Sequence, residues 1–153
     1  MQIEERIKEL GIDLPQAAAP AAMYVPVKKT GNLLFVSGQI PVKDGQMVYT
    51  GKAGDERTLE EAQAAARLCA INIISAVKAY VSDLDKVKSI VKITAFVASK
   101  TGFDKQHLVA NGASELLFDV FGEAGRHTRS AVSVNQLPLD ATVEVEAIVE
   151  VEA

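Results

Sequence analysis

A single cysteine, Cys69, occurs among the 153 residues, so no disulfide can form within the chain. It falls in the apolar stripe of a predicted helix and has no cationic neighbour in that stripe, which favours inert packing over reactivity. The N-terminal segment lacks the apolar region of a signal peptide, and no uninterrupted apolar run reaches the length of a membrane span. We therefore expect a cytoplasmic protein with no membrane-spanning segment.

Strong positive charge is also missing. Sixteen basic and twenty acidic side chains give a formal net charge of −4, and no segment is strongly basic, so nucleic acid is not an expected partner. Only two histidines occur, His107 and His127, and neither has metal-ligand spacing. No phosphate-binding loop, dinucleotide fingerprint or nucleophile elbow is present. We expect no metal site.

The length of the chain predicts one domain over residues 1–153. Helices are predicted at Gln2–Leu10, from the capping box of Thr58 and Glu61 to about Tyr80, and at about Asp104–Phe121. An irregular arm is predicted at Asp13–Ala22, and extended segments at Met23–Lys29, Leu33–Val36, Met47–Thr50 and Lys86–Ala98, with two more near the C-terminus. This order predicts an α+β fold, in which a mixed β-sheet carries two main helices on one face.

The second face of that sheet needs a cover. The predicted strands at Leu33–Val36 and Val87–Val97 carry apolar residues on both faces, whereas two helices can cover only one face. A second copy of the chain is the simplest candidate for the other face.

The C-terminal segment has the pattern of a β-hairpin. Two alternating stretches, His127–Val134 and Ala141–Glu150, flank a loop that contains Pro138 and Asp140. If the loop is centred near Pro138, Arg129 lies beside Glu146 on the partner strand. Such pairs are usually weak surface ion pairs, but apolar neighbours favour partial burial, where the planar guanidinium suits a carboxylate ligand.

Other polar residues also allow both a functional and an ordinary interpretation. Ser37 before Gly38 could simply end a strand, and Tyr24 could be strand packing. Asn111 within the last predicted helix could be solvated. Taken one by one, these residues do not indicate a common site.

Several motifs of this chain occur together in a known family. They are FVSGQIP at Phe35–Pro41, VKITAFV at Val91–Val97, TRSAVSVNQLPLDATVEVEAI at Thr128–Ile148, and Asn111 in the last helix. Through them the chain resembles the RidA/YjgF family, also known as L-PSP endoribonucleases or translation inhibitors, from about Pro20 to its end. The resemblance implies a chorismate-mutase-like fold and a homotrimer with clefts between subunits. Residues 1–19, which include the predicted N-terminal helix, are an N-terminal extension relative to compact family members.

The resemblance also implies an activity. Family enzymes hydrolyse reactive enamines and imines, such as 2-aminoacrylate, to a 2-keto acid and ammonia. They need no cofactor, because the imine carbon is already electrophilic. The position matching Arg129 holds the substrate carboxylate, and the one matching Glu146 helps to place the attacking water. The implied substrate-binding residues are Tyr24, Ser37, Gly38, Asn111 and Ser130.

Three departures mark a divergent subgroup: Ala22-Met23 replaces a Gly-Pro, His127-Thr128 replaces a Pro-Ala, and Ala131 replaces a common cysteine. Two alternatives to an imine hydrolase remain. One is a non-catalytic or chaperone-like trimer that only binds small carboxylates. The other is an endoribonuclease, which requires a cationic groove and an acid–base pair, and the acidic composition argues against it.

Overall fold

The computed structural model describes residues 2–17 and 23–153. Its helices are α1 (Gln2–Glu9), α2 (Leu59–Val81) and α3 (Gln106–Phe121), with short 3₁₀ turns η1 (Leu84–Lys86), η2 (Gly122–Gly125) and η3 (Pro138–Asp140). Its strands are β1 (Val27–Thr30), β2 (Leu33–Gln39), β3 (Val42–Lys43), β4 (Gln46–Met47), β5 (Val87–Ala98), β6 (Thr128–Val134) and β7 (Val143–Val151). The predicted α+β class and all three helices are confirmed.

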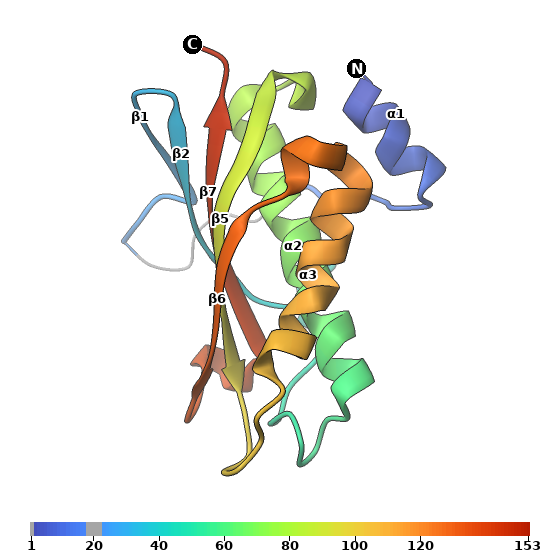
Figure 1. The fold of residues 1–153 in the computed structure, drawn as a ribbon, viewed down its shortest axis with the longest axis vertical. Helices are drawn as coiled ribbons and strands as arrows, with labels where there is room; N and C mark the ends of the chain where they lie inside the picture. Colours follow the sequence, from blue (N-terminus) through green and yellow to red (C-terminus); the bar gives the residue numbers. More distant parts are fainter. Residues whose placement is uncertain (1, 18–22) are drawn as a thin grey trace.

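The main sheet has the strand order β1-β2-β7-β5-β6, while β3 and β4 form a small separate sheet. Only the β5–β6 pair is parallel, so the sheet is mixed as predicted. Helices α2 and α3 lie side by side on one face of the sheet (Figure 1). Within the described residues, no helix covers the opposite face, which we call the open face.

The predicted C-terminal hairpin is wrong. Strand β6 pairs in parallel with β5, and β7 pairs antiparallel with the other edge of β5, so β5 separates the two strands. Parallel neighbours need a crossover connection, and α3 supplies it between β5 and β6. The long apolar strand β5 takes an interior place, whereas the more polar β6 is left at the edge of the sheet.

Helix α2 forms the centre of the core. The predicted capping box is present, because the Thr58 hydroxyl accepts from the Glu61 N–H and the Glu61 carboxylate accepts from the Thr58 N–H. By length and composition alone α2 could cross a bilayer, but half of its most apolar window is buried inside the structure, as in a core helix. Cys69 on this helix is fully buried, as predicted, and burial raises the pKa of its thiol, which disfavours the reactive thiolate.

Helix α1 docks on the outer end of the helical layer (Figure 1). The Asp85 carboxylate accepts from the backbone N–H groups of Gln2 and Ile3, which have no partner within their own helix. At the other contact, Arg6 donates from Nε to the backbone oxygen of Asp119 near the end of α3. Part of the arm predicted to be irregular, residues 18–22, lies outside the described residues.

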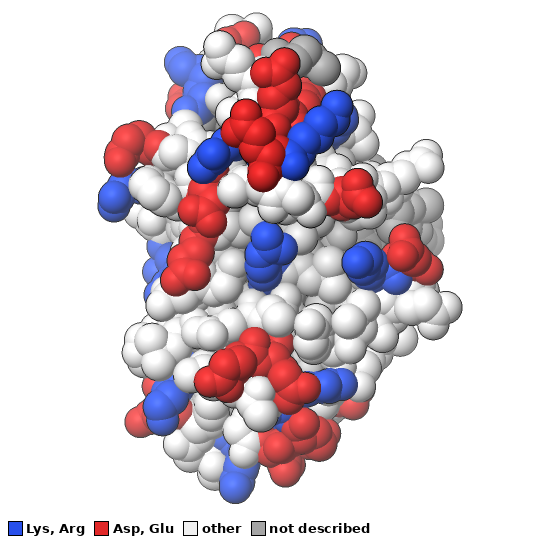
Figure 2. Space-filling model, turned by 90° about the vertical axis from the view of Figure 1, so that its right-hand side faces the viewer, with Lys and Arg blue, Asp and Glu red and all other residues white. Residues whose placement is uncertain are grey.

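The helical side of the molecule has a mixed surface. Lysines and arginines lie among aspartates and glutamates, and uncharged surface separates them (Figure 2). In this view the basic side chains form no continuous face of the kind that binds a nucleic-acid backbone.

Gly112 allows α3 to approach α2 closely. A Cβ atom at this position would lie 2.0 Å from the backbone oxygen of Gln63. Alanine usually stabilises a helix interior by about 1 kcal/mol relative to glycine. Here we expect Gly112→Ala to destabilise the fold by about 1–3 kcal/mol, because the helices must separate. Urea unfolding followed by circular dichroism measures this, with the exposed Glu115→Ala on the same helix as the control. A raised midpoint for Gly112→Ala would contradict the close packing.

Candidate functional site

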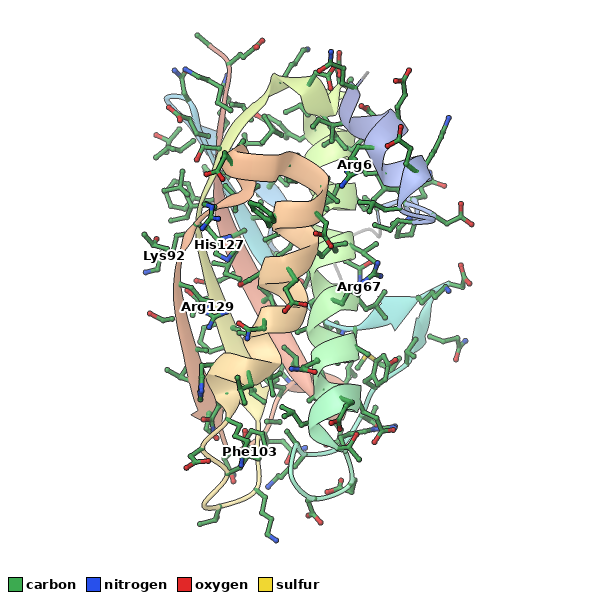
Figure 3. All side chains as sticks on the ribbon, turned by 45° about the vertical axis from the view of Figure 1, so that its right-hand side comes forward. Arg6, Arg67, Lys92, Phe103, His127 and Arg129 are labelled. Atoms are coloured by element: carbon green, nitrogen blue, oxygen red, sulfur yellow. The ribbon has the colours of Figure 1, made fainter. Side chains whose placement is uncertain are left out.

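Arg129 lies between β6 and α3, on the face of the sheet that the helices cover (Figure 3). Its Nη1 atom donates to Asn111 Oδ1 at 2.8 Å and to Ser114 Oγ at 3.0 Å. Its Nη2 atom donates to the backbone oxygen of His107 at 3.1 Å. All three acceptors belong to α3, so one helix face fixes the position of the guanidinium group.

This arrangement leaves part of the guanidinium group free. Arginine carries five N–H donors, and the three bonds to α3 are the only hydrogen bonds of this side chain within the described residues. The donors left are Nε–H and one N–H of Nη2, on nitrogen atoms that share one edge of the planar group. That edge has the geometry for two parallel hydrogen bonds to a carboxylate.

His127 extends the network beyond Arg129. Its Nδ1 lies 2.7 Å from the backbone oxygen of Gly125, and its Nε2 lies 2.8 Å from Ser114 Oγ. A carbonyl oxygen only accepts, so Nδ1 carries the proton and the neutral ring accepts the Ser114 hydroxyl proton at Nε2. Burial lowers the pKa of His127, the hydrogen bond to Gly125 opposes this, and the Arg129 charge adds to the lowering.

A cavity of about 380 Å³ opens beside this network. Its wall includes the Phe118 ring, and the Arg126 guanidinium lies 5.0 Å from the centre of that ring. The other lining residues are Ser114, Glu115, Asp119, Gly125, His127 and Arg129. The volume is in the range of small-molecule sites, which is roughly 300–1,000 Å³.

A second group of predicted residues lies at the end of β2. The β2–β7 register shifts between Val36 and Gln39, so Ser37 and Gly38 form a bulge. A Cβ atom on Gly38 would lie 2.0 Å from Glu144 Oε2, so glycine is what allows this carboxylate to lie against the strand. The Ser37 hydroxyl donates to the backbone oxygen of Val25, which ties the bulge to the segment that carries Tyr24.

Glu144 is the carboxylate of this second group. It is half-buried, and burial raises its pKa, with a further increase from the negative charge of Glu146. A carboxylate with a raised pKa is a stronger base, and carboxylates that act on protons in active sites commonly have this property. Tyr24, next in sequence to the Val25 that Ser37 contacts, is 51% exposed and leaves its ring available for contact.

The predicted contact between Arg129 and Glu146 is wrong. Paired residues on neighbouring strands share a face, and Arg129 pairs with Ile93, whereas Glu146 and Ser130 both pair with the next residue, Thr94. Glu146 and Ser130 therefore face the open side, away from Arg129. No ion pair joins Arg129 to a carboxylate anywhere in residues 2–17 and 23–153.

Apart from Glu146 and Ser130 on the open face, the predicted site residues fall into two separate groups. Arg129 and Asn111 meet on the helical side, while Tyr24, Ser37 and Gly38 gather at the end of β2. The sequence interpretation missed three contributors, Ser114, His127 and Glu144. Ser114 follows Asn111 by three residues on one helix face, a spacing that could have indicated it. Glu144 and Glu146 lie two residues apart on the same face of β7, and the sequence pattern does not tell their roles apart. The bulge at Gly38, against which Glu144 lies, distinguishes them.

A family model described as YjgF/chorismate mutase-like, putative endoribonuclease, matches residues 4–151. The chain belongs to the RidA/YjgF family. The predicted chorismate-mutase-like fold is confirmed by the same match and by similar solved structures. One of these is the protein Atu1372 from Agrobacterium tumefaciens, described as of unknown function. It superposes with a TM-score of 0.93 at 49% identity, over 99% of this chain and 93% of that one.

Two curated relatives carry different descriptions. Protein TCP17 of Trypanosoma cruzi is 49% identical over 150 residues, which is 97% of this chain and 94% of that protein. The 2-iminobutanoate/2-iminopropanoate deaminase of Escherichia coli K12 is 32% identical over 134 residues, which is 85% of this chain and 90% of that protein. Within the RidA/YjgF family, this chain is therefore similar both to a deaminase and to proteins whose names give no activity.

Proposed function

We propose that this RidA/YjgF protein hydrolyses reactive 2-imino acids to 2-keto acids and ammonia. The observation that carries the proposal is the oriented guanidinium group of Arg129, which has one edge free for a carboxylate. The similarity to the E. coli 2-iminobutanoate/2-iminopropanoate deaminase supports the same reaction class. The imine carbon is already electrophilic, so the proposal requires no metal or organic cofactor.

The reaction needs a base as well as an anchor. The oxygen of a water molecule bonds to the imine carbon, and one water proton passes to a carboxylate and from there to the nitrogen. The hydroxyl proton of this adduct then passes to the nitrogen through the same carboxylate while the carbon–nitrogen bond breaks, which leaves a keto group and ammonia. We assign the proton transfer to Glu144 in place of Glu146, since Glu144 is half-buried with a raised pKa.

Arg129 and Glu144 cannot act on one substrate within a single chain. Arg129 lies on the helical face at the β6 edge, whereas Glu144 lies on the open face of β7, with β5 between the two strands. A site with both groups therefore needs Arg129 and Asn111 from one copy, and Glu144, Gly38 and Tyr24 from another. We propose a cytoplasmic homotrimer with such clefts between subunits, in which the open faces pack together.

The open face supports this assembly. It exposes Phe35 by 44% and Val132 by 45%, and Phe96 and Ile148 are only partly buried beside them. We expect sedimentation to show a trimer, and Phe35→Glu to release monomers, because a charge would then lie in the apolar interface. Tyr80→Glu, at an exposed end of α2, is the matched control and should leave the trimer intact. A wild-type chain that stays monomeric at micromolar concentration would contradict the proposal.

The direct test is turnover of freshly generated 2-iminobutyrate, followed as release of 2-ketobutyrate and ammonia above the spontaneous rate. If 2-ketobutyrate binds and the imine is not turned over, the alternative of a non-catalytic carboxylate-binding trimer replaces the proposed hydrolase. RNA cleavage would have to survive repurification and vanish in an Arg129 variant to support the endoribonuclease named in the family description. The mixed charge of the helical side does not favour RNA (Figure 2).

A further inference from the structure

A series of hydrogen bonds runs from Arg129 through Ser114 and His127 to Gly125, and each bond has a defined donor and acceptor. The carbonyl of Gly125 fixes the proton on Nδ1 of His127, and the bare Nε2 then fixes the direction of the Ser114 hydroxyl proton. With that proton directed at the ring, a lone pair of Ser114 Oγ faces Nη1 of Arg129 at 3.0 Å. Each bond therefore determines the orientation of the next one.

We propose that Ser114 and His127 are positioning residues, which hold Arg129 so that its Nε–Nη2 edge faces the substrate carboxylate. This inference rests on the proposed function. Asn111 and the His107 carbonyl could hold the guanidinium by one bond to each terminal nitrogen. Of the three bonds that Arg129 donates, only the one to Ser114 connects to a ring that bridges α3 and the turn before β6. It therefore links the helix, the arginine and the edge strand.

The same geometry excludes a catalytic role for His127 in its observed state. Both ring nitrogens are occupied within the chain, Nδ1 by a carbonyl and Nε2 by a hydroxyl proton. The ring has neither a free lone pair for a proton of water nor a free N–H for a leaving group. Its contribution passes through Ser114 to Arg129, a role that a substitution series can separate from general packing.

Ser114→Ala removes the middle of the chain, and Ser114→Thr keeps its oxygen. We expect Ser114→Ala to lower kcat/KM for 2-iminobutyrate and the affinity for 2-ketobutyrate by about tenfold each, the scale of one hydrogen bond to a charged group. Ser114→Thr should retain most of both values. His127→Leu should resemble Ser114→Ala, whereas His127→Gln keeps an acceptor and should recover part of the loss. Thr101→Ala removes an exposed hydroxyl with no hydrogen bond in the described residues and is the matched control.

Nitrogen-15 NMR of the full-length protein supplies a readout that does not depend on catalysis. The wild type should show His127 protonated at Nδ1 only near pH 7, and the Arg129 side-chain signals should indicate a rigid group. In Ser114→Ala the Arg129 signals should show faster motion, and in Ser114→Thr they should not.

The outcomes separate this inference from the proposed function. If the wild type lacks deaminase activity, yet Ser114→Ala loosens Arg129 and weakens 2-ketobutyrate binding, the proposed function fails and the positioning role stands. If the wild type is an active deaminase, and Ser114→Ala changes neither the Arg129 signals nor kcat/KM, the positioning role is overturned. A His127 ring protonated at Nε2 would overturn it as well.

Discussion

Arg129→Lys is expected to lower the rate of 2-iminobutyrate hydrolysis by about 10²-fold, although the charge is unchanged. A small imino acid offers one strong handle, its carboxylate, and the free edge of the guanidinium group can fix both its position and its plane. Lysine supplies the same charge from a single rotating ammonium group and cannot fix the plane. A misplacement of about 1 Å costs roughly 10²-fold in rate. Arg129→Ala should abolish turnover and the binding of 2-ketobutyrate.

The competing interpretation is that Arg129 only joins α3 to β6. In that case the lysine variant would lose some stability, because the hydrogen bonds of Arg129 to Asn111 and Ser114 are weakened. It would still bind 2-ketobutyrate with wild-type affinity. Calorimetric titration of Arg129→Lys decides between the two, provided that circular dichroism and the mass of the assembly stay normal. Arg67→Lys is the matched control, since Arg67 is exposed on α2, away from β6 and Arg129 (Figure 3).

The parts of the fold that follow from local pattern could be predicted from the sequence. The capping box at Thr58 begins α2 where expected, and the apolar stripe that contains Cys69 faces the core. The order of elements and the apolar strand β5 predicted the mixed sheet and its uncovered face. The capping box, the apolar stripe and the pattern of β5 each lie within about twenty consecutive residues, where periodicity and capping operate.

The strand neighbours could not be predicted in the same way. Alternation within Thr128–Val134 and Val143–Val151 shows that both segments are strands, and an eight-residue connection is compatible with a hairpin. The same connection is also long enough to step across one intervening strand, because neighbouring strands lie only about 4.8 Å apart. The parallel crossover through α3 decides the outcome, and it depends on packing between distant segments.

The same error in strand order explains why the sequence interpretation placed Arg129 and Glu146 together, whereas the structure separates them. With a hairpin, Arg129 and Glu146 would face each other, and one chain would hold both residues in contact. With β5 between them, side-chain alternation sends Arg129 to the helices and Glu146 to the open face. Family resemblance implied a substrate-binding role for Asn111, and the structure joins Asn111 to Arg129 by a hydrogen bond within the β5–α3–β6 unit.

Glu144→Gln is expected to slow imine hydrolysis by about 10²-fold, the scale of one general-base group, and to leave the assembly intact. Glutamine keeps the shape that lies against Gly38 but cannot take a proton from water. Glu146→Gln, two residues along the same face, should cost less than about threefold. The reverse order of effects would restore the role that family resemblance assigned to Glu146.

The pH profile distinguishes the two carboxylates further. Hydrolysis requires Glu144 as the carboxylate, so turnover should fall as the pH decreases through its pKa, and burial together with the charge of Glu146 places that pKa above the usual value of 4.5. Removing the Glu146 charge removes one cause of the raised pKa. The acid limb of Glu146→Gln should therefore move to lower pH, while Glu144→Gln should lose this limb entirely. An acid limb at the same pH in all three proteins would mean that neither glutamate supplies the base, and the proton transfer would have to be assigned to a different group.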